Sequence, residues 1–137
     1  MESERDLNAW LEDFLAQHGA TSGTIHLFQD GGLRLAAAVN IPPPVQQVVA
    51  WVPRGKGMAG LALERREPIL TCNLKEDQTG NVKPGAKAVD ARGAVAIPVD
   101  DAGGEVRAVV GIAFLQERDF SPVDLQALQR SASTLPA

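Results

Sequence analysis

The sequence has little of the chemistry that marks many functional classes. Its 137 residues include one cysteine, two histidines and no tyrosine. A single cysteine, Cys72, cannot form an internal disulfide, which is typical of a reducing compartment and predicts a cytoplasmic location. Two histidines at distant positions, together with that one cysteine, supply too few ligands for a zinc or iron–sulfur site.

Charge and apolar patterning exclude further classes. Thirteen basic residues stand against 17 acidic ones, a net charge of −4, which gives no electrostatic footprint for nucleic acid. With two tryptophans and four phenylalanines, a stacking platform for single strands is not expected either. No apolar run approaches the roughly 20 residues that cross a bilayer, and the acidic start, Met1–Trp10, does not resemble a leader peptide. We therefore expect neither a nucleic-acid nor a membrane partner.

The composition that is present predicts one globular domain. The hydrophobic fraction is 45% and the charged fraction 22%, both ordinary for a soluble domain. The length matches a single hydrophobic core that folds without a metal or disulfide. We expect residues 1–137 to form one domain.

Hydrophobic periodicity predicts the order α-β-β-α-α-β-loop-β-β-α. Turn sequences at Asp30–Gly32 and Asp100–Gly104 make hairpins of two strand pairs, which favours an antiparallel sheet with helices on its faces, an α+β sandwich. Ser121, followed by Pro122 and Asp124, is typical of a helix start. The expected elements are a first helix ending before Gly19, helices 45–52 and 58–65, a last helix from Pro122, strands 24–29, 33–39, 68–73, 93–99 and 105–115, and a long loop over 74–92.

The glycine-rich stretch Gly55–Gly60 invites a phosphate-binding interpretation. A Walker loop needs G-x-x-x-x-G-K-S/T, and a dinucleotide fingerprint needs a strand before it, whereas here a valine-rich segment precedes. The structural interpretation is a tight turn with close packing. It predicts that Gly57 or Gly60 has a positive φ or lies against neighbouring backbone.

Other reactive residue types have structural interpretations. His26 lies in a strand on the same face as Phe28, with no partner at fixed spacing, so we expect a hydrogen-bonded histidine on one sheet face. Cys72 has no nearby base in sequence that would lower its pKa, which predicts a packed, non-catalytic thiol. Asp100 and Asp101 precede turn glycines, and turn chemistry explains both. We expect no catalytic residue and no metal site.

Several motifs in one order nevertheless resemble those of a known family. A proline–glycine turn of the form P-x-G-x-G-x-x-G opens a helix, a strand begins with a proline, and two later strands and a helix start follow. Together they resemble a GAF domain over nearly the whole chain. The matching segments are Val52–Gly60, Pro68–Asn73, Ala96–Val99, Val110–Phe114 and Arg118–Asp124.

The resemblance implies a GAF-like sandwich. In that family a central antiparallel sheet carries the terminal helices on one face, and middle helices and loops roof a ligand pocket on the other. Lys56 and Asn73 are the available polar anchors for an unidentified small molecule, and no cofactor is assigned. The residues expected to bind the ligand are Phe28, Trp51, Lys56, Met58, Leu61, Asn73 and Val89.

Departures from the family's branches narrow the function. Cyclic-nucleotide binding goes with an N-K-x-x-F-D-E signature, which Asn81–Lys83 does not continue. Covalent bilin attachment uses a cysteine in a helix–loop region, whereas Cys72 is expected in a strand. The free methionine-(R)-sulfoxide reductase branch has a cysteine where Ala59 stands here, and sulfoxide reduction normally needs two thiols.

The sequence therefore predicts a non-enzymatic sensor or regulatory domain in signalling that binds a small molecule. The alternatives are an enzyme of the sulfoxide-reductase type and a pocketless module for protein interaction or dimerisation. A homodimer through the first and last helices is expected, because their apolar stripes are wide and a sheet face accommodates little more than two helices. Trp10 or Leu11 would then be left partly exposed. The stripes are Leu7, Trp10, Leu11, Phe14 and Leu15, and Leu125, Leu128, Ala132 and Leu135.

Overall fold

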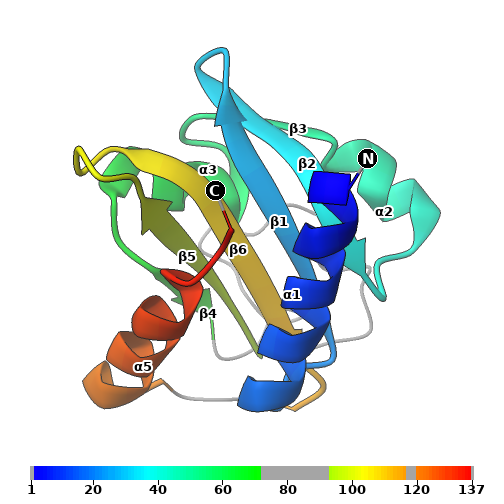
Figure 1. Cartoon of the computed structure of the whole chain (residues 1–137), viewed down its shortest axis with the longest axis vertical. Helices are drawn as coiled ribbons and strands as arrows, with labels where there is room; N and C mark the ends of the chain where they lie inside the picture. Colours follow the sequence, from blue (N-terminus) through cyan, green and yellow to red (C-terminus); the bar gives the residue numbers. More distant parts are fainter. Residues whose placement is uncertain (1, 72–92, 117–119, 137) are drawn as a thin grey trace.

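The computed structural model describes residues 2–71, 93–116 and 120–136, with side chains from Asp6 onward except that of Thr71. Hairpins, short helices and a capped last helix follow one another largely as the periodicity predicts (Figure 1). The elements are α1 (Glu2–His18), β1 (Ser22–Gln29), β2 (Gly32–Val39), α2 (Pro43–Val48), β3 (Trp51–Pro53), α3 (Gly57–Arg65), β4 (Ile69–Thr71), β5 (Gly93–Asp100), β6 (Val106–Phe114) and α5 (Pro122–Ala132). No helix among these is both long and apolar enough to cross a bilayer.

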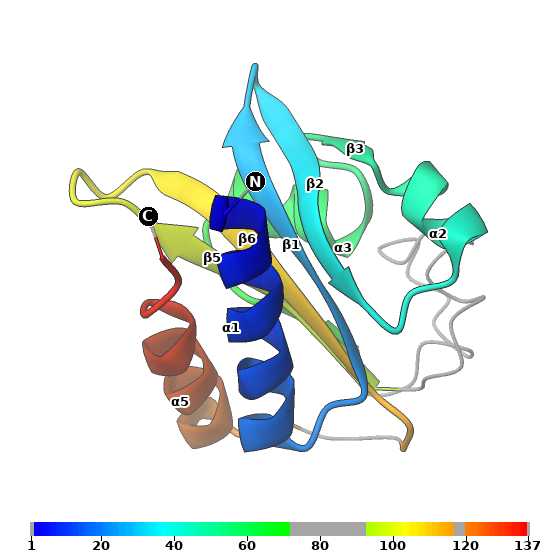
Figure 2. The same ribbon diagram turned by 45° about the vertical axis from the view of Figure 1, so that its right-hand side comes forward.

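Six strands of the described chain form one antiparallel sheet in the order β3-β2-β1-β6-β5-β4. The two hairpins, β1–β2 and β5–β6, meet where β1 pairs with β6 in the centre of the sheet. Helices α1 and α5 lie side by side on one face, and α2 and α3 lie on the other (Figures 1 and 2). This arrangement confirms the expected α+β sandwich.

Local sequence signals act as predicted at two places. The Ser121 side chain accepts a hydrogen bond from the Asp124 amide, and the Asp124 carboxylate accepts one from the Ser121 amide, a capping box that starts α5. In the β5–β6 turn, Asp101 Oδ1 accepts hydrogen bonds from the amides of Gly103 and Glu105. The carboxylates of Asp124 and Asp101 therefore both serve to hydrogen-bond backbone amides, one at a helix start and one in a turn.

The helix expected over 45–52 is wrong at its end. Helix α2 stops at Val48, and Trp51–Pro53 forms the edge strand β3 instead. The valines of this segment have helical spacing, but Val52 pairs with Leu33 of β2 and is buried against it. Tertiary pairing of a β-branched segment outweighs a weak local preference.

The apolar stripes of α1 and α5 are buried against the sheet within one chain. Leu11 is fully buried, so of the two residues expected to be left partly exposed, Trp10 is the one that is. Trp10 is half-buried; its indole stacks on Phe14 with ring centroids 4.8 Å apart, and Nε1 donates to Thr134 Oγ1 at 3.1 Å. The core here is Leu7, Leu11, Phe14, Leu15, Ile25, Ala37, Val95, Ile97, Val99, Ala108, Val110, Ile112, Phe114, Leu128, Ala132 and Leu135.

The glycine turn between β3 and α3 confirms the steric prediction. Gly57 has φ of +66°, which favours glycine. Gly60 is buried in α3, and a methyl group there would overlap the carbonyl oxygen of Pro53. The turn is closed by a hydrogen bond from the Gly55 amide to the Gly60 carbonyl at 2.9 Å. These contacts set the position at which α3 begins on the sheet.

Candidate ligand cavity

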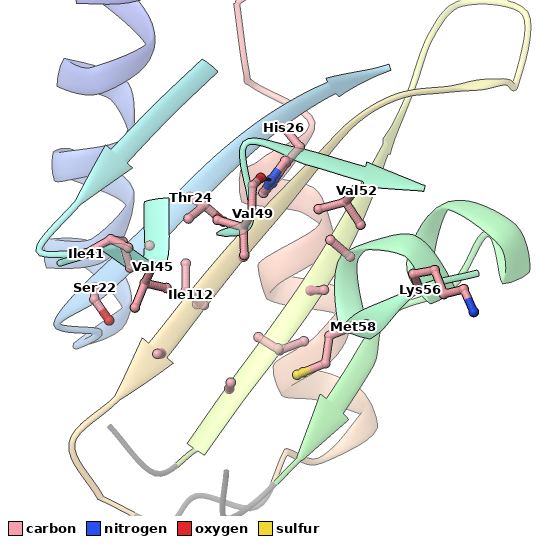
Figure 3. Close-up of a pocket in the computed structure, with 18 residues that line it drawn as sticks. Ser22, Thr24, His26, Ile41, Val45, Val49, Val52, Lys56, Met58 and Ile112 are labelled. Atoms are coloured by element: carbon pink, nitrogen blue, oxygen red, sulfur yellow. Dashed lines mark hydrogen bonds between the residues drawn. The ribbon is translucent and has the colours of Figure 1, made fainter. Parts of the chain in front are cut away.

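A cavity of about 140 Å³ lies between the sheet and the two helices α2 and α3 (Figure 3). Its floor is formed by the central strands, and its lining is overwhelmingly apolar. The lining residues are Ser22, Gly23, Thr24, His26, Ile41, Val45, Val49, Val52, Lys56, Gly57, Met58, Ala59, Ala94, Val95, Ala96, Gly111, Ile112 and Ala113.

Strand alternation and small side chains explain where the space comes from. Residues two apart along a strand share a face, so Ser22, Thr24 and His26 of β1 all face α2. On the neighbouring strands β6 and β5, the cavity is lined by small residues, including Gly111, Ala94 and Ala96. A methyl group at Gly111 would lie 3.0 Å from Thr24 Oγ1, so that glycine gives the threonine hydroxyl room. Small residues under a helical roof leave a void.

The roof is held to the sheet by His26. Its ring is 3% exposed, and Nε2 lies 2.8 Å from the carbonyl oxygen of Val49, just after α2. Because a carbonyl oxygen only accepts, Nε2 carries the proton and donates. This confirms the expected hydrogen-bonded histidine on one sheet face. Inside α2 itself, Val45 turns its side chain into the cavity, near Ile41 (Figure 3).

Ser22, in the floor of the cavity, is a buried polar residue whose hydroxyl has no hydrogen-bond partner among the described residues. It is 3% exposed and lines the cavity. A buried hydroxyl without a partner costs about 1–3 kcal/mol. The floor of this apolar cavity therefore presents a polar atom that the described part of the protein does not satisfy.

Two of the predicted ligand-binding residues lie on the cavity wall. Met58 points its thioether into the space, while Lys56 contributes its stem and directs its ammonium away from the other lining side chains (Figure 3). Two further predicted residues, Asn73 and Val89, fall outside the described residues, as does Cys72. The wall that the structure describes is thus mostly formed by residues that were not predicted.

Trp51, Phe28 and Leu61 are placed away from the cavity, contrary to the prediction. Trp51 pairs with Arg34, on the opposite face from its neighbour Val52; it packs over Gly32 and stays 44% exposed. It is Val52 that lines the cavity.

Phe28 shares the cavity face of β1 but lies two residues beyond His26. It is 41% exposed beneath the Arg54 guanidinium, which is 5.9 Å from the ring centroid. Leu61 is one helical turn after Met58 and packs with Leu33 and Val109 in the core under α3. Both residues therefore sit past the end of the void.

Within the described ranges, no three side chains of His, Cys, Asp or Glu gather into a metal-binding group. The described part of the cavity wall offers shape, apolar contact and a few hydrogen-bonding groups.

Comparison with known proteins identifies the fold and its relatives. A family model described as GAF domain matches residues 7–135. The fold is similar to the free methionine-R-sulfoxide reductase of Neisseria meningitidis in complex with its substrate, with a TM-score of 0.77 and 16% identity over 97% of this chain and 75% of that one. It is also similar to a GAF domain from a phosphoenolpyruvate-protein phosphotransferase of Coxiella burnetii, with a TM-score of 0.74 and 20% identity over 96% and 80%. No curated protein matched the sequence.

Proposed function

This chain belongs to the GAF domain family, and from that premise we propose that it is a cytoplasmic, non-enzymatic regulatory domain that binds a small molecule in the cavity under α2 and α3. The observation that carries the proposal is the cavity itself: an apolar space of about 140 Å³ whose floor holds a hydroxyl with no hydrogen-bond partner among the described residues. Concave, mainly apolar sites with few polar groups are typical of small-molecule binding.

The position of the cavity supports a signalling role. At Gly23, strand β1 lies against both the cavity and α1: its backbone lines the cavity, while a Cβ there would lie 3.1 Å from Leu11 and 3.0 Å from Leu15. Ile25, two residues on, is buried in the α1–α5 core. A ligand that shifts β1 must therefore change the packing of the terminal helices, which pass such a change to a partner.

Filling the cavity is expected to abolish binding without unfolding the protein. In Ala94→Leu the larger side chain occupies the space next to Val45 and Met58. We expect toluene, phenol or benzoate, added in turn to the 15N-labelled wild type, to shift the amide resonances of cavity residues, and none to do so in the variant. Ala16→Leu, on the exposed face of α1, is the matched control and should bind like wild type.

Val45→Phe fills the same space from the roof, so a failure of Ala94→Leu to fold leaves the test intact. The proposed function is wrong if none of the three probes perturbs the cavity residues of the wild type, or if the filled variants respond as the wild type does.

An enzyme of the sulfoxide-reductase type is the rival function, since two of the similar folds are methionine-R-sulfoxide reductases. Sequence identities of 17% and 16% between this chain and those reductases indicate a shared fold but do not indicate a shared reaction. Ala59, in the first turn of α3 on the cavity wall, stands where the resemblance to that branch implies a cysteine, and Cys72 is the one thiol of the chain.

Replacing Cys72 by serine is expected to change no activity. We expect neither the wild type nor Cys72→Ser to reduce free methionine-(R)-sulfoxide in a thiol-coupled assay, because the sequence places no base near Cys72 that would activate it as a nucleophile. Turnover by the wild type that the substitution removes would establish an enzyme instead.

Dimerisation through α1 and α5 is the second candidate function. The two helices lie side by side with their outer surfaces uncovered (Figure 2). Their apolar stripes are already buried in the chain's own core, so a second copy would meet mostly polar side chains. Among the described residues of these helices, the large apolar side chains that stay partly exposed are Trp10, Leu125 and Val123, which is 73% exposed in the first turn of α5.

A further inference from the structure

We propose that the occupant of this cavity is a small neutral molecule, hydrocarbon over most of its surface, with one oxygen that hydrogen-bonds to Ser22. The inference rests on the proposed function, because it names the class of ligand for the same cavity. It is carried by three features: the charge of the lining, the state of the Ser22 hydroxyl and the size of the space.

The described lining offers no charged group directed at an occupant. Its ionisable residues are His26 and Lys56. His26 donates to the Val49 carbonyl, and the Lys56 ammonium points away from the cavity (Figure 3). Moving an ion from water into apolar surroundings without a paired charge costs far more than moving a neutral polar group. Among the described lining residues, a carboxylate would find the Ser22 and Thr24 hydroxyls and the first amides of α3, around Gly57 and Met58, but no positive charge directed at it.

The Ser22 hydroxyl specifies a polar atom on the ligand. Ser22 Oγ is buried, lines the cavity and has no hydrogen-bond partner among the described residues. A buried water typically makes about three hydrogen bonds, whereas this floor offers chiefly the Ser22 and Thr24 hydroxyls. An alcohol, phenol or ketone oxygen satisfies Ser22 with a single bond, and its hydrocarbon part contacts Val45 and Met58.

The volume limits the size of the molecule. A protein cavity of about 150 Å³ lined by aliphatic and aromatic side chains binds benzene, and this one measures about 140 Å³. A molecule held entirely inside this space therefore has about six to eight non-hydrogen atoms. Phenol and toluene are of this size and differ only by a hydroxyl in place of a methyl group.

The test is the effect of Ser22→Ala on the binding of those two probes, measured by NMR titration of the full chain. We expect the variant to bind phenol about tenfold more weakly, the value of one hydrogen bond, and to bind toluene as the wild type does. Benzoate, the anionic probe, is expected to bind the wild type at least tenfold more weakly than phenol.

The outcomes separate the ligand class from the proposed function. If Ser22→Ala leaves phenol binding unchanged, or weakens phenol and toluene equally, the role of Ser22 is refuted while the binding function stands. If benzoate binds best, the neutral class is refuted and the amides of α3 become the anchor. If none of the three probes binds the wild type, the proposed function fails as well.

A second readout distinguishes a ligand-binding hydroxyl from a structural one. Without ligand, Ser22→Ala is expected to melt at the same temperature as the wild type or higher, because the substitution removes a buried hydroxyl that has no partner in the described part of the chain. Ser121→Ala, which deletes the bonded hydroxyl that caps α5, is the matched control and should melt lower. A lower melting temperature for Ser22→Ala would show that its hydroxyl stabilises the fold, and would overturn the assignment.

Discussion

Replacing Gly60 by alanine is expected to lower the free energy of unfolding by about 3 kcal/mol. A methyl group there would overlap the Pro53 carbonyl oxygen and lie 3.2 Å from the Gly55 amide nitrogen. Both are backbone atoms of the turn that starts α3, so neither can move aside without breaking the Gly55–Gly60 hydrogen bond. The gain in helix propensity, about 1 kcal/mol, does not offset this.

Urea denaturation measures the effect, with Gly103→Ala as the matched control. A Cβ at Gly103 would lie 3.4 Å from Asp101 Oδ1, an ordinary contact, so that variant should stay within about 0.5 kcal/mol of wild type. Equal stability of the two variants would mean that the turn does not pack as described.

Leu11→Ala is expected to cost about 3–5 kcal/mol. Leu11 is fully buried between α1 and the sheet, and its removal leaves a cavity in the main core. Leu115→Ala, at a side chain that is 56% exposed, is the control and should change stability by about 0.5 kcal/mol or less.

The same denaturation curves test dimerisation. In a monomer the midpoints do not depend on protein concentration, whereas a dimer that forms through α1 and α5 becomes more stable as concentration rises.

For Leu11→Ala itself, a decrease in the free energy of unfolding of less than about 1 kcal/mol would contradict the burial of α1 in the chain's own core.

The fold was predictable because its signals are local. Asp30–Gly32 and Asp100–Gly104 set the two hairpins, and Ser121 with Asp124 sets the last helix. Their order restricts the sheet to a few topologies, of which the family motifs indicate one. Strand β3 was missed because three residues are too short for a period, and its pairing with β2 is a tertiary contact.

The cavity was less predictable than the fold. Trp51 and Val52 are neighbours, and which of them faces the cavity depends on the register with β2, which the sequence does not specify. Large side chains were expected to line the pocket, yet the space exists because Ala94, Ala96 and Gly111 are small. The alternation of Ser22, Thr24 and His26 along β1 was the available signal, since polar residues recur there on one face.

The most direct test of small-molecule binding in this cavity is a crystal structure of the chain grown with phenol. The account predicts one phenol ring between Val45, Met58 and Ala94, with its oxygen within hydrogen-bond distance of Ser22 Oγ. A structure in which side chains fill this space, and phenol is absent or bound only on the surface, would contradict it.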